Sequence, residues 1–181
     1  TVNPTPEVNL NPTALAVCGG QPINVDLSAN ATPGATFTWT NNNVNTGIPA
    51  SGSGNIAATA ATVTTAQVSV ISVTPTLGVC AGTPETITVT VNPTPTATLP
   101  ADQTACGGQT VSVNLTGQPA ATTVSWTNTN TAIGLAASGT GNINFTAAAV
   151  AGAETGQITI TPTLGACTGV AQTFDITVNP T

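Results

Sequence analysis

The four cysteines are the most regularly spaced of the few side chains here that could do chemistry. Cys18 and Cys80 are 62 positions apart, and Cys106 and Cys167 are 61 positions apart. Zinc sites commonly use closely spaced pairs such as CxxC, and the sequence has none. Matched, widely separated pairs instead predict structural disulfides formed in an oxidising compartment. The alternative is a set of buried free thiols.

Side chains suited to catalysis or metal binding are scarce. The chain has no His, Lys, Arg or Tyr, and no two of its six carboxylates lie within ten residues of each other. General acid–base catalysis needs such groups, and a Ser or Thr nucleophile needs a base to activate it. Asn41, Asn42 and Asn43 offer oxygen ligands for calcium, but no acidic loop accompanies them, so we expect a polar turn there. We predict no enzyme activity, no metal and no cofactor.

The composition restricts the partners. A net charge of −6 without a single basic residue argues against nucleic acid and against anionic membrane surfaces. Apolar residues make up 40% of the chain, and Thr and Val favour a pleated surface, so we expect a folded, β-rich protein. No apolar run reaches 18 residues, so no membrane insertion is predicted. Any export signal is expected outside this sequence.

The sequence is two tandem copies of one unit. Landmarks recur in the same order at a step of 87 to 89 residues: TVNPTP from positions 1 and 90, CGGQ from 18 and 106, SGSGNI and SGTGNI from 51 and 138, and TPTLG from 74 and 161. Coincidence does not give so many ordered matches. Since TVNPT also ends the chain, we expect the two copies to belong to a longer array.

The copies meet at an alternating proline segment. We predict domains at 1–93 and 94–181, with Pro93 and Pro95 as the linker. Proline cannot donate to a sheet and has a fixed φ, so these residues should end the last strand and stiffen the joint.

Alternating apolar and polar residues predict short strands within each copy. The clearest are 23–28, 36–41, 67–73 and 86–91 in the first copy and 111–116, 123–128, 157–163 and 174–179 in the second. A first strand near 8–17 and weaker ones near 44–48 and 55–63 bring the count to about seven. The prediction is an all-β fold of two tandem immunoglobulin-like β-sandwich domains.

The disulfide connectivity has two solutions. Pairs Cys18–Cys80 and Cys106–Cys167 would each close a loop worth roughly 4 kcal/mol of stability. However, five strands of alternating direction would put the cysteines of one copy at opposite ends, which favours an inter-repeat Cys18–Cys167 bond. We expect the intradomain pairs, because each copy then carries a complete staple.

The aromatic residues and sequons have mostly structural interpretations. Trp39 and Trp126 are expected in the core, since a chain with five aromatic residues depends on them for buried area. A sugar-binding platform is the alternative. The glycosylation sequons at Asn30, Asn114 and Asn144 are weak signals in a chain rich in Asn and Thr.

The motifs resemble a known family. FTWTNN and VSWTNT around the two Trp residues, CGGQ before the second strand, and TITVTVNPTP at the joint are similar to the PKD-like and Ig-like tandem repeats of giant Bacteroidetes surface proteins. Gliding-motility adhesins exported by the type IX secretion system are the best-known members. The PKD signature DFGDG is replaced here by TNNN and TNTN.

The residues and the resemblance together predict a structural role. We expect a semi-rigid spacer in an extracellular adhesin stalk or filament at a bacterial cell surface, with neighbouring copies of the repeat as partners. The alternatives are a module that binds a surface glycan or protein ligand, and a subunit of a filament assembled by strand exchange.

Overall fold

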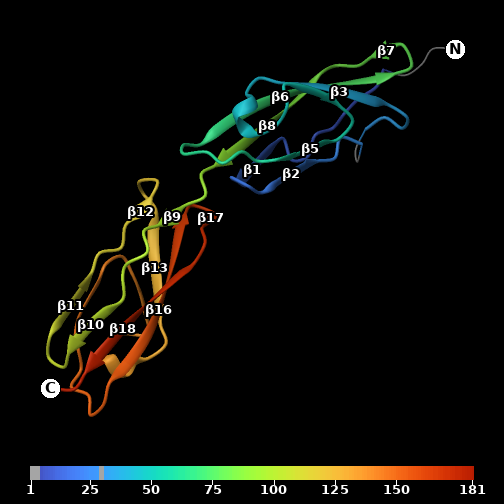
Figure 1. Cartoon of the computed structure of the whole chain (residues 1–181). Helices are drawn as coiled ribbons and strands as arrows, with labels where there is room; N and C mark the ends of the chain where they lie inside the picture. The colour runs from blue at the N-terminus through green and yellow to red at the C-terminus, as the bar shows by residue number, and fades with distance from the viewer. Residues whose placement is uncertain (1–4, 29–30) are drawn as a thin grey trace. The chain divides into compact units, whose positions relative to one another are not determined.

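The structure is a computed structural model that describes residues 5–28 and 31–181 (Figure 1). The sequon at Asn30 and the start of the first TVNPTP stretch lie outside these residues. The chain divides into two compact units, Thr1–Thr94 and Pro95–Thr181. Each unit is an immunoglobulin-like β-sandwich, so the predicted fold class is confirmed.

The first unit has a large sheet of order β1–β8–β6–β3–β4, with β7 paired to β6, and a small sheet of β2 and β5. Its elements are β1 (Ala14–Cys18), β2 (Pro22–Val25), β3 (Thr36–Asn41), the 3₁₀ turn η1 (Val44–Thr46), β4 (Ser51–Ser53), β5 (Ile56–Thr59), β6 (Gln67–Leu77), β7 (Cys80–Ala81) and β8 (Glu85–Asn92). β1 runs parallel to β8, and the other pairs are antiparallel.

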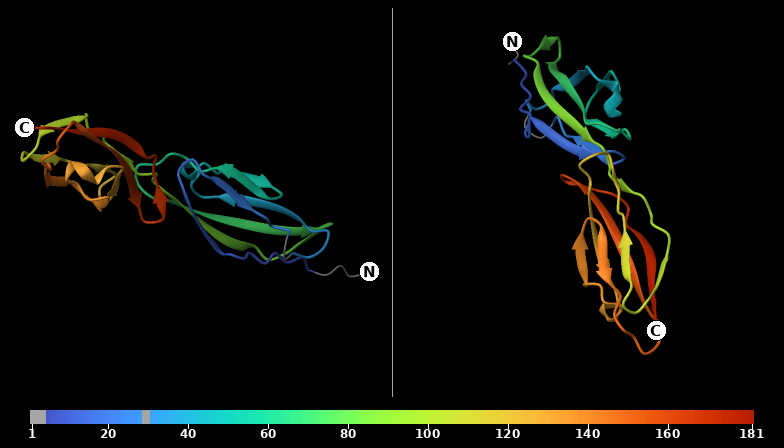
Figure 2. Two further views of the ribbon diagram at one scale, coloured as in Figure 1. Left: turned by 90° about the horizontal axis from the view of Figure 1, so that it is seen from below. Right: turned by 90° about the vertical axis from the view of Figure 1, so that its left-hand side faces the viewer.

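The second unit repeats this topology, with a large sheet of order β10–β18–β16–β13–β14, β17 paired to β16, and a small sheet of β11 and β15. A further ribbon pairs β9 with β12. Its elements are β9 (Thr96–Ala97), β10 (Gln103–Cys106), β11 (Thr110–Val113), β12 (Gly117–Gln118), β13 (Thr123–Asn128), η2 (Thr131–Ile133), β14 (Ser138–Thr140), β15 (Ile143–Thr146), β16 (Glu154–Leu164), β17 (Cys167–Thr168) and β18 (Gln172–Asn179). Figure 2 shows the strands of each unit from two further directions.

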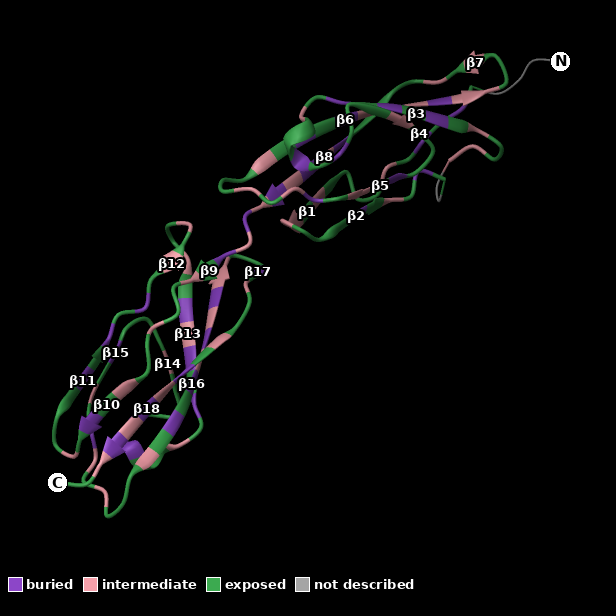
Figure 3. Ribbon diagram, in the orientation of Figure 1, coloured by how far each residue is buried: buried purple, intermediate pink, exposed green. Residues whose placement is uncertain are grey.

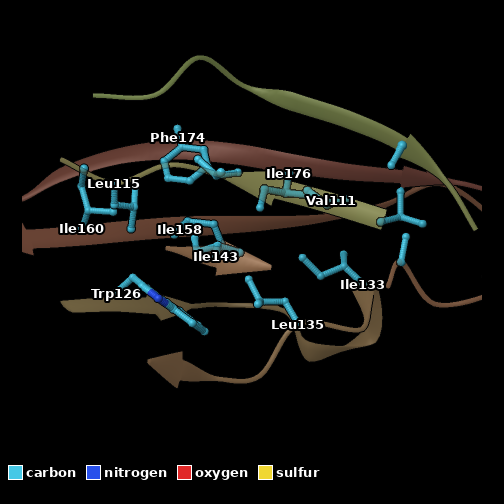
Figure 4. Packing of buried hydrophobic residues seen from close by; sticks show 14 of the residues in the cluster. Val111, Leu115, Trp126, Ile133, Leu135, Ile143, Ile158, Ile160, Phe174 and Ile176 are labelled. Carbon is cyan, nitrogen blue, oxygen red and sulfur yellow. The ribbon is translucent and has the colours of Figure 1, made fainter. Parts of the chain in front are cut away.

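Burial alternates along the strands as a two-layer fold requires. On β3, Phe37, Trp39 and Asn41 are buried and the residues between them are exposed, and β8 and β18 show the same period of two (Figure 3). In the second unit Trp126, Ile158 and Phe174 pack with other side chains between the two sheets (Figure 4). Burial of such side chains contributes about 1.5–3 kcal/mol each.

The prediction of a weak strand near 44–48 is wrong. The segment forms the turn η1, because the Asn43 side chain accepts a hydrogen bond from the Asn45 N–H at 3.0 Å. Gly47 ends the turn with φ +91°, a conformation that glycine adopts without strain. The edge strand of this region is β4, a few residues later. Within the described ranges, no helix is long and apolar enough to cross a membrane.

Candidate functional site: cysteines at the two ends of each repeat

The cysteines differ in oxidation state. Cys18 and Cys167 are disulfide-bonded, whereas Cys80 and Cys106 are free thiols. The expected pairs Cys18–Cys80 and Cys106–Cys167 are therefore wrong, because each of them would need one of the two free thiols.

Strand register explains why a bond within the first repeat does not form. Cys80 lies opposite Leu77 at one end of β6. Cys18 lies opposite Asn92 of β8, the residue after Val91, which pairs with Gln67 at the other end of β6. Leu77 and Gln67 are ten residues apart on β6, which is about 33 Å of strand. A disulfide needs Cα atoms within about 7 Å of each other, so Cys18 and Cys80 cannot meet.

The second repeat has the same register. Cys167 lies opposite Leu164 on β16, and Cys106 lies opposite Asn179 at the end of β18. Glu154, ten residues from Leu164, pairs with the residue before Asn179, so the same strand length separates the two sulfur atoms. Each repeat thus holds one cysteine at each end of the sandwich.

We call Cys18 and Cys106 the downstream cysteines, because each lies where the chain leaves its repeat. The Gly19 N–H donates to the Asn92 carbonyl at 2.9 Å, and the Thr94 hydroxyl donates to the Gly19 carbonyl at 2.8 Å. These two bonds hold the departing linker against the turn that follows Cys18. In the second repeat the matching Gly107 N–H donates to the Asn179 carbonyl at 3.0 Å.

We call Cys80 and Cys167 the upstream cysteines, because each lies where the chain arrives at its repeat. Gly82 packs so closely on the Pro6 carbonyl that a Cβ there would overlap the oxygen, and Gly169 makes the same contact with Pro95. Both glycines also donate their N–H to a proline carbonyl of the neighbouring long strand, at 2.8 and 2.9 Å. The arriving linker is therefore fixed beside the hairpin that carries the upstream cysteine.

The remaining candidate residues have structural positions. Trp39 and Trp126 are 7% and 8% exposed and belong to the two cores. The Trp39 indole N–H donates to the Gly54 carbonyl at 3.1 Å, whereas the buried Trp126 indole nitrogen has no partner among the described protein atoms. A Cβ on Gly52 would overlap the Trp39 ring, so this glycine leaves room for the indole.

The side chains of Asn41 and Asn42 make hydrogen bonds to the backbone of their own repeat. The buried Asn41 amide donates to the carbonyls of Asn43 and Ile48 at 3.0 and 2.8 Å and accepts from the Asn43 N–H. Asn42 accepts from the Val70 N–H at 2.8 Å. The described residues contain no group of three or more His, Cys, Asp or Glu side chains arranged to hold a metal ion.

Residues 15–95 match the family model of a PKD-like domain. No curated protein sequence is significantly similar to the chain.

Several solved structures are similar to the chain at low sequence identity. Sidekick-1 immunoglobulin domains 1–4 are 16% identical, with 96% of this chain and 48% of that chain covered and a TM-score of 0.49. Dpr11 IG1 bound to DIP-gamma is 10% identical, with coverage of 98% and 99% and a TM-score of 0.46. The fibronectin(III)-like modules of Clostridium thermocellum CbhA are 16% identical, with coverage of 97% and 95% and a TM-score of 0.39.

Proposed function

We propose that the two repeats are a spacer segment of a longer extracellular array, the stalk or filament of a bacterial surface adhesin. Its function is mechanical: it holds another part of the assembly at a distance and resists being pulled apart. Neighbouring repeats are its principal partners. The PKD-like match and the tandem sandwiches support the general class.

One observation carries the proposal. Each end of the linker is fixed to the repeat beside it: the Thr94 hydroxyl donates to the Gly19 carbonyl in the first unit, and the Pro95 carbonyl packs on Gly169 in the second. A linker fixed at both ends has few free torsions. Limited freedom at the joint is useful to a spacer under tension.

The linker suits the same purpose. β8 ends at Asn92, directly before Pro93, and β9 begins at Thr96, directly after Pro95. The connection is therefore three residues long. A short proline-containing linker is semi-rigid, whereas a glycine–serine linker of equal length is flexible.

The linker can be tested by replacing Pro93 and Pro95 with glycine. We expect a broader distribution of molecular shapes in small-angle X-ray scattering, measured after all four cysteines are reduced and alkylated so that no disulfide restricts the chain. Pro49→Gly, in an exposed loop of the first repeat, is the matched control. An unchanged distribution in the double variant would show that the prolines do not stiffen the joint.

The spacer function itself is tested on native material. Antibodies to the repeat should label intact cells, and the reduced native chain should have a mass several times 17.6 kDa. Absence of labelling on intact cells, together with a chain found only inside them, would refute the proposal.

A further inference from the structure

The two free thiols stand in the same places as the two oxidised cysteines. Cys80 and Cys167 occupy one position of the repeat, each opposite a Leu at the end of the longest strand. Cys18 and Cys106 occupy the other, each opposite an Asn at the end of the last strand. One member of each matched pair is disulfide-bonded and the other is free.

We infer that Cys80 and Cys106 are joint-forming thiols for further copies of this repeat. Since a downstream cysteine lies where a linker departs and an upstream cysteine where one arrives, Cys80 takes the downstream cysteine of a preceding copy, and Cys106 takes the upstream cysteine of a following copy. This inference rests on the proposed function and extends it, since it adds a disulfide between copies. The partner is a repeat of the same kind, in the same chain or in a second chain.

The surroundings of both thiols permit this reaction. Cys106 is exposed and Cys80 is partly exposed, so an attacking sulfur can reach them. The sequence contains no Lys, Arg or His, so no basic side chain binds an anionic partner beside either thiol. The backbone of Cys106 is held in place, because its N–H donates to the Gln109 side chain at 2.8 Å.

The chemistry is ordinary thiol–disulfide exchange with a small-molecule disulfide as the oxidant. The Cys106 thiolate attacks one sulfur of the oxidant, which gives a mixed disulfide and releases one thiolate. The Cys80 thiolate of the second copy then attacks the Cys106 Sγ and releases the other thiolate. Two thiol protons are lost, two electrons pass to the oxidant, and one Cys106–Cys80 bond forms.

The test uses the two-repeat chain in a glutathione redox buffer. We expect a ladder of oligomers on non-reducing gels that collapses to a single band with dithiothreitol. Cys80→Ser and Cys106→Ser should each abolish the ladder and leave dimers at most. A ladder that persists in either variant would overturn the inference.

A mixture separates complementary joining from random oxidation. Equal amounts of the Cys80→Ser and Cys106→Ser variants contain one reactive thiol each, and random pairing gives roughly half mixed dimers, whereas a head-to-tail contact favours the mixed pair. We expect mixed dimers to predominate at redox equilibrium. Half or fewer would show that the two ends do not recognise each other.

The bond itself can be located with a protease that cleaves after Glu. Cleavage at Glu7, Glu85 and Glu154 separates fragments 8–85, 86–154 and 155–181. The inferred bond joins 8–85 of one copy to 86–154 of another. A cyclic monomer with this linkage would contradict joining between copies.

Two further results distinguish this inference from the proposed function. A native chain of several repeats without free thiols would place the partner in the same chain, whereas a native chain of 17.6 kDa after reduction would place it in separate copies. Surface labelling with random pairing of the variants would leave the spacer proposal intact and refute the joint thiols alone.

Discussion

The unreduced chain should contain two reactive thiols. Cys18 and Cys167 are disulfide-bonded, whereas Cys80 and Cys106 are free. Alkylation of the denatured chain should therefore modify two of its four cysteines before reduction and all four after it. Mass spectrometry of the intact chain counts the modified cysteines in each case.

Single substitutions assign the two thiols. The Cys80→Ser variant should have one reactive thiol before reduction, because a free thiol is removed. The Cys18→Ser variant should have three, because the cysteine bonded to Cys18 loses its partner.

The measurement also tests the expected intradomain pairs. Bonds Cys18–Cys80 and Cys106–Cys167 would leave no reactive thiol in the unreduced chain. A count of zero, or a count of four, would refute the oxidation states of the structure.

Three comparisons of variants test the packing in the sandwiches, each by chemical denaturation. Trp39→Phe should cost about 1 kcal/mol more than Trp126→Phe, because only Trp39 donates an indole hydrogen bond, and equal losses would contradict this. Asn41→Ala should cost about 2–3 kcal/mol by leaving buried carbonyls unpaired, whereas Asn42→Thr, which copies the second repeat, should be nearly neutral. Gly52→Ala should cost about 1–3 kcal/mol by displacing the indole, and a neutral effect would refute the close contact.

The repeats and the main strands could be predicted from the sequence because their signals are local. The strand containing Trp39 has the predicted bounds, Thr36–Asn41, and the alternation along it marks the buried face. The lengths of the longest strands were underestimated, since β6 continues through Pro75 to Leu77. A proline normally argues against a sheet interior, but the Pro75 carbonyl still accepts the Gly82 N–H there.

The pairing of the cysteines could not be predicted with the same security, because it depends on the direction of every strand between them. The segment at 44–48 is a turn, and losing one strand there would by itself put Cys18 and Cys80 at the same end of the sandwich. The unpredicted edge strand β4 restores the count, so five strands still separate Cys18 from the β6–β7 hairpin. The geometric argument for opposite ends was sound, and the preference for a self-contained staple was the error.

The contacts of the linker have a consequence for changes in its length. Thr94 is held in the first unit by its hydrogen bond to Gly19, and Pro95 is held in the second by its close contact with Gly169. A residue inserted between Thr94 and Pro95 would be the first that neither unit holds. The length of the linker, together with its prolines, would therefore set how freely one repeat turns against the next.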